Sequence, residues 1–486
     1  MITSSLSRFS YLPSESIEKS HETSLKVLEE LGLEFNHPEA LAVLEQSGAE
    51  VVDRENNLVR LPRGLVLEAI AKAPAEFALH ARNPAHTVTI GGDHIVTAPV
   101  YGPPFVHDLD RGRRGAVLED FRNFVKLAQM TPQIHNAGGT VVEPEDEPQE
   151  TRHLPMVYSL MKYSDKTFMG SVTSAENARD TVELAGILFG GKDVIAHKPV
   201  VISLINVNSP RRYDTRMLEA LFEYVRARQP VIITPFILAG AMSPVALGGT
   251  LVQQNAEALA GITLAQLVSP GTPVVYGSFL SNTDMQSGSP CFGTPESAMG
   301  LFVSAQLARR YHLPFRGGGG LTTSKLPDAQ AAYEAAMGFW PTFLAGTNFV
   351  LHAAGWLEAG LVSSYEKFVL DVELLRMMEI FLKGIPLDDE GLALDALEEV
   401  GPGGHFLGAA HTMRHFRDAF WRPLVSDRLN FESWQQKGSK SADRRANEIW
   451  KKWLADYQAP PLDPGIDEAL RGHIIKREVA IKAGLA

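Results

Sequence analysis

The stretch Pro314-Phe315-Arg316-Gly317-Gly318-Gly319-Gly320-Leu321-Thr322-Thr323-Ser324-Lys325 carries a short apolar run into four consecutive glycines and then into a small polar loop. Four glycines leave the backbone bare, so another molecule or a crowded turn can come close to it. A Walker A phosphate loop would place glycine directly before the lysine, but Ser324 occupies that position. The stretch is therefore typical of a strand that opens into a loop, and it does not predict a nucleotide phosphate site.

The same order of apolar run, loop and amphipathic segment recurs on both sides of this stretch. We expect strands at residues 95–101, 135–142, 167–172, 199–207, 230–237, 273–279, 313–317 and 347–353. We expect helices near residues 118–130, 151–163, 175–189, 212–228, 252–268, 295–312, 327–344 and 363–383. Continuous apolar runs are typical of parallel strands buried on both faces. The eight units predict an α/β fold, a (β/α)8 (TIM) barrel over residues 95–385.

An open, doubly wound sheet is the alternative arrangement of these units. The absence of a Gly-x-Gly-x-x-Gly turn after the first strand, together with the even number of units, favours the barrel. Helical extensions are expected on both sides. Residues 1–94 predict an N-terminal helical cap with a hairpin around Gly91-Gly92-Asp93, and residues 386–486 predict a C-terminal helical extension. These extensions would cap the barrel or form a subunit interface.

Composition excludes several classes of protein. The 486 residues include 45 basic and 57 acidic side chains, and a net charge of -12 disfavours nucleic acid as a partner. The single cysteine, Cys291, excludes an internal disulfide framework and a thiolate metal cluster. No apolar run approaches the roughly 20 residues of a membrane span. We therefore expect a soluble cytoplasmic protein that does not bind membranes.

Aromatic side chains stand at or just after several predicted strand ends, where a barrel of this class carries its chemistry. They are Tyr101, Phe105, Phe236, Tyr276, Phe279 and Trp356. If they converge, the faces of their rings would bind a quaternary ammonium group. The alternative is that each ring packs a loop against the rest of the fold.

Glycines on neighbouring loops point to the same end of the predicted barrel. Gly138-Gly139, Gly277 and the run Gly317 to Gly320 would leave a wide, shallow mouth. Such a mouth suits a large planar cofactor that is delivered from outside. The alternative is that these glycines only serve turns.

Metal binding is the competing chemistry, and the sequence offers two stretches for it. His411 and His415 have helical i, i+4 spacing with His405 upstream, but the glutamate of a zinc-protease motif is missing. A structural role is favoured there, with a zinc site or a partner contact as the alternatives. The acidic stretch 107–110 runs directly into the arginine-rich stretch 111–114, so local salt bridges explain it better than a metal.

Several blocks of sequence resemble the trimethylamine methyltransferase family of corrinoid-dependent enzymes. The blocks are RGGGG (316–320), LPDAQA (326–331), LHAAGWLE (351–358), GPGGHFL (401–407) with His411-Thr412, and DMQSG (284–288). The resemblance covers nearly the whole chain. It implies a (β/α)8 barrel that moves a methyl group from an amine to the Co(I) of a corrinoid (cobalamin) carried by a separate protein.

The resemblance also bears on the substrate. Founding members act on trimethylamine and carry pyrrolysine, whose position here would fall near Ser324-Lys325, yet this sequence contains only standard residues. A quaternary amine needs no proton to leave, because its nitrogen departs as a neutral tertiary amine. We therefore expect glycine betaine as the substrate and dimethylglycine as the product. Proline betaine, carnitine and trimethylamine are the alternatives.

Site residues follow from this resemblance. His352 and Tyr101 are expected at the reaction centre, with Arg316 on the substrate carboxylate and the aromatic side chains around its trimethylammonium group. Gly317, Gly318, Gly319, Gly320 and Ser324 are expected to admit the corrin ring. No metal site and no tightly bound cofactor are expected, whereas a corrinoid protein partner is, and homo-oligomerisation is open.

Two functions of other classes compete with methyl transfer. One is a betaine-binding or regulatory protein without catalytic activity that kept the fold. The other is a lyase that forms a Schiff base through Lys325. Lys325 lies past the strand at a helix start, where a solvated lysine is favoured.

Overall fold

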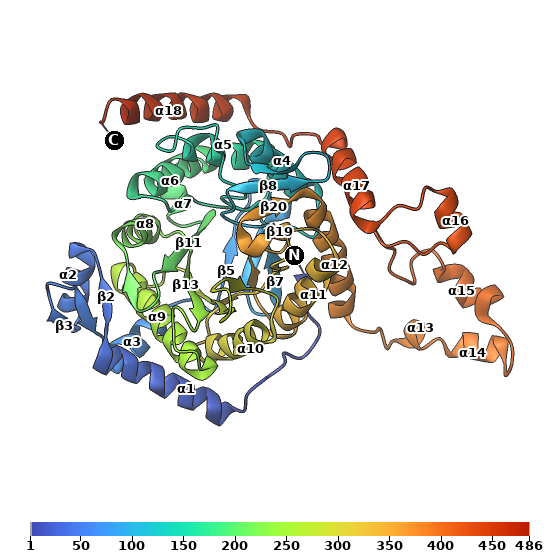
Figure 1. Ribbon diagram of the computed structural model, residues 1–486, viewed down its shortest axis with the longest axis horizontal. Coiled ribbons are helices and arrows are strands. Elements are labelled where there is room, and N and C mark those ends of the chain that lie inside the picture. The colour runs from blue at the N-terminus through green and yellow to red at the C-terminus, as the bar shows by residue number, and fades with distance from the viewer. Residues whose placement is uncertain (1, 486) are drawn as a thin grey trace.

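A computed structural model describes residues 2–485, and seven parallel strands form its centre (Figure 1). Along the sheet their order is β10 (Phe168–Met169), β11 (Val201–Val207), β13 (Val231–Ala239), β14 (Val274–Gly277), β17 (Phe315–Arg316), β18 (Phe349–Val350) and β7 (His94–Thr97). Every neighbouring pair in this series is parallel. The strands follow one another in chain order except for β7, which is first in the chain and lies at the far end of the series.

The predicted strand at 135–142 is replaced by irregular backbone between β7 and β10. Asn136 makes only an isolated parallel bridge with Thr167. The N–H groups of His135 and Asn136 both donate to the carbonyl of Thr97, and Gly138 has a φ of 92°. Two donors on one acceptor and a left-handed glycine break the strand pattern, yet the segment is hydrogen-bonded to strands on both sides.

Eight long helices surround these strands, close to the predicted ranges. They are α4 (Leu118–Met130), α5 (His153–Tyr163), α6 (Ala175–Phe189), α8 (Thr215–Arg226), α9 (Leu247–Val268), α10 (Pro295–Arg310), α11 (Ala329–Leu344) and α12 (Tyr365–Lys383). Polar side chains cap the N-termini of several of these helices. Asp214, Thr294 and Asp328 each accept a hydrogen bond from the backbone N–H three residues later. Short α7 (Lys192–Ile195) follows α6.

Apolar side chains divide between the two faces of the strands. Val231 and Ile233 of β13 belong to a large cluster that includes side chains of the surrounding helices. Ile232, between them, belongs to a second cluster, which contains no helix side chain and includes Val96, Val275 and Phe349. Successive strand residues point to opposite faces, so both faces are buried.

The N-terminal segment combines helices with small sheets. Its elements are β1 (Ile2–Thr3), α1 (Ser14–Lys26), a π-helical turn (Val27–Leu31), β2 (Leu33–Phe35), α2 (Pro38–Gln46), β3 (Glu50–Asp53), β4 (Leu58–Arg60), α3 (Arg63–Ile70), β5 (Glu76–Leu79), a 3-10 turn (Pro84–His86) and β6 (Val88–Gly91). β2 also pairs with β12 (Arg212–Tyr213). The hairpin predicted around Gly91-Gly92-Asp93 is confirmed, because β6 pairs antiparallel with β7 there.

Additional short strands follow the carboxyl ends of several central strands. β8 (Phe105–Asp108), β9 (Gly112–Gly115), β19 (Trp356–Leu357) and β20 (Val362–Ser364) form one small sheet, with a 3-10 turn (Glu358–Gly360) between β19 and β20. β15 (Phe279–Thr283) runs beside β13 and pairs with β16 (Pro290–Cys291). These additions lie over the loops that build the cavity described below.

The C-terminal segment leaves the body and then returns. Its elements are α13 (Asp389–Leu392), α14 (Leu394–Val400), a 3-10 turn (Phe406–Gly408), α15 (Ala410–His415), α16 (Phe431–Gln436), α17 (Ala442–Asp456) and α18 (Pro464–Lys482). Residues 384–440, which we call the arm, project from one side of the molecule (Figure 1). α17 packs on α12, and α18 packs on α6. No helix within residues 2–485 is long and apolar enough to span a membrane.

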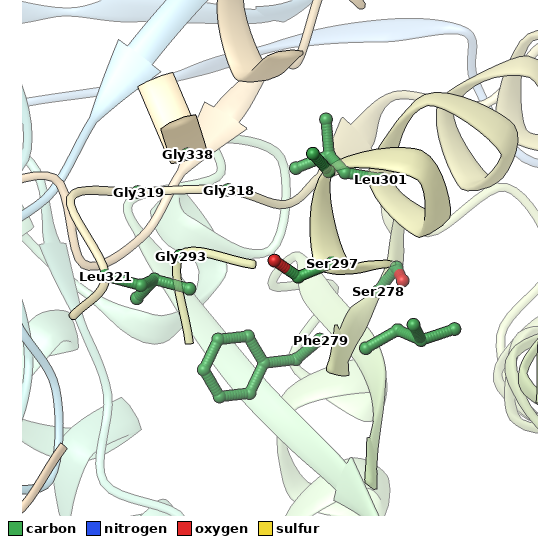
Figure 2. A pocket seen from close by; sticks show the side chains of 11 residues that line it. Ser278, Phe279, Gly293, Ser297, Leu301, Gly318, Gly319, Leu321 and Gly338 are labelled. Carbon is green, nitrogen blue, oxygen red and sulfur yellow. The ribbon is translucent and has the colours of Figure 1, made fainter. Parts of the chain in front are cut away.

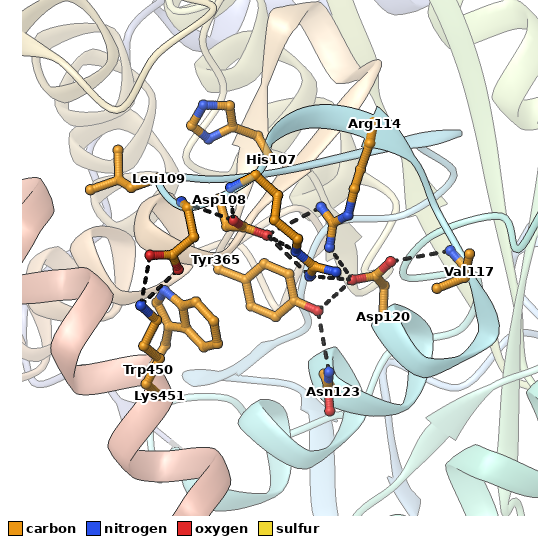
Figure 3. Close-up of polar contacts among 12 residues, drawn as sticks. His107, Asp108, Leu109, Arg114, Val117, Asp120, Asn123, Tyr365, Trp450 and Lys451 are labelled. Atoms are coloured by element: carbon orange, nitrogen blue, oxygen red, sulfur yellow. Dashed lines mark hydrogen bonds and ion pairs between the residues drawn. The ribbon is translucent and has the colours of Figure 1, made fainter.

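A polar network, part of it buried, fastens α17 to the body (Figure 3). Glu366 is fully buried and accepts a hydrogen bond from Trp450 Nε1 at 2.9 Å. Asp110 pairs with Lys451 at 2.7 Å. The ring of Tyr365, whose hydroxyl donates to Asp120 at 2.8 Å, packs against that of Trp450 with the ring centroids 4.6 Å apart. The returning helix is thus held by charge-assisted hydrogen bonds as well as by apolar packing.

Candidate functional site

A cavity of about 350 Å³ opens where the central strands end. Its lining residues are Tyr101, Leu204, Asn206, Val207, Asn208, Thr234, Phe236, Met242, Phe279, Arg316, His352 and Trp356. They come from β11, β13, β15, β17 and β19 or from the loops after β7, β11, β13 and β18. The carboxyl ends of parallel strands lie at one edge, which is where such folds bind ligands. The lining includes one basic side chain and no acidic one.

Arg316 supplies the single fixed charge of this cavity. Its side chain is 1% exposed, and its one hydrogen bond within residues 2–485 runs from Nη1 to the carbonyl of Ser278 at 3.1 Å. Nε is buried without a partner. Burial lowers the pKa of Arg316 to about 9, so the guanidinium remains charged at neutral pH. A buried cation without a carboxylate is costly, so an anionic group from outside would be bound strongly here.

His352 is held next to Arg316 in a fixed tautomer. The backbone N–H of Tyr101 donates to Nδ1 of His352 at 3.2 Å, so Nδ1 is an acceptor and the ring proton lies on Nε2. Burial, and then the charge of Arg316, hold the pKa of His352 well below its usual range. The backbone φ of His352 is 64°. A left-handed non-glycine residue is uncommon, and such strain is concentrated at functional sites.

The aromatic side chains meet around Phe279. Its ring centroid lies 5.4 Å from that of Phe236, 5.2 Å from that of His352 and 5.8 Å from that of Trp356. The guanidinium carbon of Arg316 lies 5.0 Å from the same ring. Trp356 is oriented by a hydrogen bond from Nε1 to the carbonyl of Thr322 at 3.0 Å. Four predicted residues, Tyr101, Phe236, Phe279 and Trp356, therefore line one cavity together with Arg316 and His352.

Tyr101 faces this cavity beside His352. Burial raises the pKa of the Tyr101 hydroxyl to about 12, against the opposing effect of its hydrogen bond with Thr140. The group therefore stays protonated at neutral pH and can donate one hydrogen bond. It cannot serve as a base there.

Two predicted site residues lie elsewhere. Tyr276 is fully buried and points to the helices, where its hydroxyl contacts Asn255 at 2.9 Å. Phe105 is the first residue of β8 in the small sheet, and the guanidinium carbon of Arg113 lies 3.7 Å from its ring centroid. Neither lines the cavity, so the expectation that they bind substrate there is corrected. Side chains alternate along β14, so Val275 belongs to the second cluster and Tyr276 points the other way, toward the helices.

The glycine tetrad does not form an open floor, which corrects the expectation of a bare mouth for the corrin ring. All four glycines are buried, between α10, α11 and the loop after β18 (Figure 2). A Cβ on Gly318 would lie 1.8 Å from Thr342 Oγ1, and one on Gly319 would lie 2.6 Å from the carbonyl oxygen of His352. The space beside them is about 30 Å³, room for one water molecule. The bare backbone serves close packing within the chain.

Ser324, also expected to contact the corrin, is buried and used by its own loop. Its hydroxyl hydrogen-bonds to the carboxylate of Asp328 at 2.9 Å and lies 3.0 Å from the carbonyl of Leu326. Lys325 is exposed and donates to the carbonyl of Thr323. Its environment is that of a solvated lysine, as expected, and lacks the apolar burial of a Schiff-base lysine.

The cavity also includes polar side chains that the sequence analysis did not single out. Asn206, Asn208 and Thr234 line it, and the hydroxyl of Thr234 is buried without a partner. Phe292 completes the aromatic cluster from the loop after β15, 5.3 Å from Trp356 between ring centroids. The strand-end positions of Asn206 and Asn208 were a signal that could have identified them.

The two stretches considered for metals lie outside the cavity. His411, His415 and Glu390 converge on the arm, with His415 Nε2 and Glu390 Oε1 2.7 Å apart. Arg414 binds the same carboxylate oxygen at 3.1 Å, which places a competing cation where a metal would lie. Asp108 forms ion pairs with Arg111 and with Arg114, both at 3.2 Å (Figure 3). The local salt bridges expected at this second stretch are confirmed.

Comparisons with known proteins agree on the family. The family model described as trimethylamine methyltransferase (MTTB) matches residues 1–482. A glycine betaine methyltransferase of Desulfitobacterium hafniense (strain Y51) is 48% identical over 472 residues, 97% of this chain and 98% of that protein. A proline betaine:corrinoid methyltransferase of Eubacterium limosum is 33% identical over 430 residues, 86% of this chain and 87% of that protein.

A solved structure supports the fold. The monomethylamine methyltransferase of Methanosarcina barkeri superposes with a TM-score of 0.53 at 11% identity and covers 93% of this chain and 90% of its own. At that identity the likeness concerns the mixed α/β fold alone. The family match extends over nearly the whole sequence and agrees with the relatives above 30% identity. This chain therefore belongs to the trimethylamine methyltransferase (MTTB) family.

Proposed function

We propose that this methyltransferase moves a methyl group from glycine betaine to the Co(I) of a corrinoid carried by a separate protein and releases dimethylglycine. The observation that carries the proposal is a cavity lined by aromatic rings and one buried, unpaired arginine, with no acidic side chain. The 48% identical relative named glycine betaine methyltransferase supports the choice of substrate. A corrinoid acceptor is supported by the name of the Eubacterium limosum relative.

The charges of the cavity favour a zwitterion over a simple ammonium. A carboxylate would pair with Arg316 and accept a hydrogen bond from Nε2 of His352, which relieves the buried charge. The trimethylammonium group would lie against the rings of Phe236, Phe279 and Trp356. Trimethylammonium without a carboxylate would instead add a second positive charge beside Arg316.

The reaction places little demand on acid–base chemistry. The methyl carbon moves to cobalt, and the nitrogen leaves with the former N–C electron pair as a neutral tertiary amine, so no proton is needed. His352 is neutral and holds its proton on Nε2, which suits a hydrogen-bond donor and not a base. The work of the site is therefore to align the carbon between nitrogen and cobalt.

Proline betaine is the second candidate substrate. It also joins a quaternary nitrogen to a carboxylate, and a relative 33% identical to this chain is named for it. A cavity of about 350 Å³ leaves room for its ring beyond what glycine betaine needs. Carnitine has the same two charges at a longer spacing.

We also propose that the central strands close into a (β/α)8 barrel over residues 95–385, flanked by 1–94 and 386–486. The segment 135–138 occupies the eighth position, because it is hydrogen-bonded to β7 on one side and β10 on the other. The second cluster, which contains Ile232 and no helix side chain, is consistent with the packed interior of such a barrel.

A methyl-transfer assay tests the proposed function. The purified protein is mixed with cob(I)alamin and with glycine betaine, proline betaine, carnitine or trimethylamine, and methylcobalamin is followed in the visible spectrum. We expect methylcobalamin with glycine betaine and none with trimethylamine. The same series is repeated with a purified corrinoid protein as the acceptor. Calorimetric binding of glycine betaine without transfer to either acceptor would refute the enzyme reading and favour a betaine-binding protein.

A further inference from the structure

The arm presents an apolar surface that nothing within residues 2–485 covers. Its most exposed apolar side chains are Ile385, Leu387, Leu392, Leu394, Leu397, Phe406, Leu407, Met413, Phe416, Phe420, Leu429 and Phe431. Leu407 is 81% exposed and Phe420 is 82% exposed. The twelve side chains together present on the order of 1,000 Å² of apolar surface.

The arm has almost no core of its own. Between residues 384 and 440 the buried side chains are Ala396, Ala409 and Val425, and Val425 lies where the chain returns to the body. Short helices such as α13, α14 and α15 are not stable alone in water. The arm therefore needs a covering surface that is present throughout the life of the protein.

The body of the same chain carries an apolar stripe without a partner. Tyr333, Met337 and Trp340 are exposed on α11 at helical spacing i, i+4 and i+7, which places them on one face. Phe381 of α12 continues this face, since its ring centroid lies 4.8 Å from that of Trp340. Met377, Ile380 and Phe381 are all more than two-fifths exposed. We call these six residues the stripe.

We propose that two copies of this chain exchange arms, each arm packing on the stripe of the other copy. Donor and acceptor surfaces occur on one chain, which is what a closed two-fold assembly requires. The arm begins directly after α12, which carries part of the stripe, and projects away from the body of the molecule (Figure 1). Its apolar area exceeds the roughly 800 Å² per partner of a standard stable interface.

A transient partner does not fit the arm as well as a second copy does. A methyl acceptor protein has to leave after each transfer, and its departure would return the whole apolar surface to water. The arm also lies at the edge of the molecule, on the side of α12 and α17 (Figure 1). An interface with a second copy is always occupied, so the apolar surface of the arm would stay covered.

Light scattering coupled to size exclusion tests the assembly. We expect twice the 53.1 kDa of one chain for the wild type at micromolar concentration. Leu407→Lys with Phe420→Lys on the arm, and separately Tyr333→Lys with Trp340→Lys on the stripe, should each give the mass of one chain. Ile475→Lys on α18, which changes an exposed aliphatic side chain outside both surfaces, should leave the dimer intact.

Cross-linking distinguishes arm exchange from other dimers. In a Cys291→Ser background, a chain with Leu407→Cys is mixed with a chain carrying Tyr333→Cys and treated with a bis-maleimide. A covalent dimer in the mixture is expected, and much less should form when Ile475→Cys replaces Tyr333→Cys. The proposal is overturned by a monomeric wild type, by a ring of three or more chains, or by lysine variants that keep the wild-type mass. Arm variants that keep their mass but lose a corrinoid protein would assign the arm to that protein instead.

Discussion

At the scale of single residues, Arg316 shows how a buried charge identifies a ligand. The guanidinium is enclosed by aromatic rings and backbone, and the described residues offer it no carboxylate. Proteins rarely keep such a charge without a partner, because removing it from water costs several kcal/mol. The absence of an internal partner is what points to an anionic group on the substrate.

Replacing the charge of Arg316 should weaken substrate binding without lowering the stability of the fold. Arg316→Met keeps much of the volume, so we expect an unchanged or higher melting temperature, because an unpaired buried charge is removed. The Kd for glycine betaine should rise roughly 10- to 100-fold, the worth of a charge-assisted hydrogen bond. Calorimetry and thermal unfolding measure the two effects. Arg113→Met, at an exposed ion pair with Glu358, is the control and should leave binding unchanged.

The aromatic cluster allows a paired comparison. Phe279→Leu removes the ring at its centre, and the KM for glycine betaine should rise roughly 3- to 30-fold, as for loss of a desolvated cation–π contact. Phe105→Leu makes the same change in the neighbouring small sheet, outside the cavity. An equal effect of both substitutions on KM would contradict the assignment of Phe279 to the substrate cation.

Buried histidines should make stability depend on pH. His352 and His135 both have a pKa held well below its usual range, mainly by burial, so the folded chain binds fewer protons than the unfolded one near pH 6. The free energy of unfolding should then be highest above the ordinary histidine pKa and fall as pH drops, by up to about 1.4 kcal/mol per unit for each histidine. Denaturant unfolding at pH 7.5, 6.5 and 5.5 measures this dependence. His352→Gln should flatten it, and an unaltered slope would exclude His352 as a contributor.

At the scale of elements, the glycine tetrad shows how a loop can be tied to a helix. Gly318 has a φ of 67° and lies against Thr342 of α11, so the loop after β17 and the helix approach more closely than side chains permit. This contact fixes the loop that follows β17. Arg316 lies directly before this loop, at the end of β17, where it pairs with Gly277 of β14 and Phe349 of β18.

A methyl group at this contact should be harmful. Gly318→Ala adds both a strained φ and a clash, so we expect a loss of roughly 2–4 kcal/mol in the free energy of unfolding. Gly248→Ala, in α9 with open space around it, should be neutral or slightly stabilising. Chemical denaturation of both variants gives the comparison. A tolerated alanine at 318 would mean that the loop can move away from α11.

At the scale of the whole molecule, a single carboxylate marks where the arm returns to the body. Glu373 on α12 is 5% exposed and accepts hydrogen bonds from the backbone N–H groups of Leu424 and Ser426, at 2.8 and 2.9 Å. These bonds connect residues 424–426 of the arm to the helix from which the arm departs. They also fix where α17 starts its path back along α12.

Loss of this carboxylate should release the return segment. Glu373→Ala leaves buried N–H groups without acceptors, so we expect a loss of roughly 2–5 kcal/mol and faster amide exchange across residues 424–456. Glu379→Ala, on the same helix beside Lys383, should change exchange little. Hydrogen-exchange mass spectrometry measures both variants. Protection equal to the wild type across 424–456 would show that packing of α17 alone holds the segment.

The sequence by itself determined the order of the central strands and of the eight surrounding helices, except for the strand expected at 135–142. Strand and helix alternation, capping residues such as Asp214 and Asp328, and the hairpin at Gly91-Gly92-Asp93 are local signals. Local hydrogen bonding and periodicity carry this information, so it can be read without the fold. The resemblance to a known family, carried by blocks that contain Arg316 and His352, also made these two residues candidates for one site.

Only the tertiary structure decided which side chains meet. Both faces of the central strands are apolar, so the pattern could not tell that Tyr276 faces the helices while Phe279 faces the cavity. Bare glycine backbone suits a bound ring and a packed helix equally, and only the position of α11 resolved that choice for Gly318. The uncovered arm was equally invisible, since exposure is a property of the folded chain and not of its apolar residues.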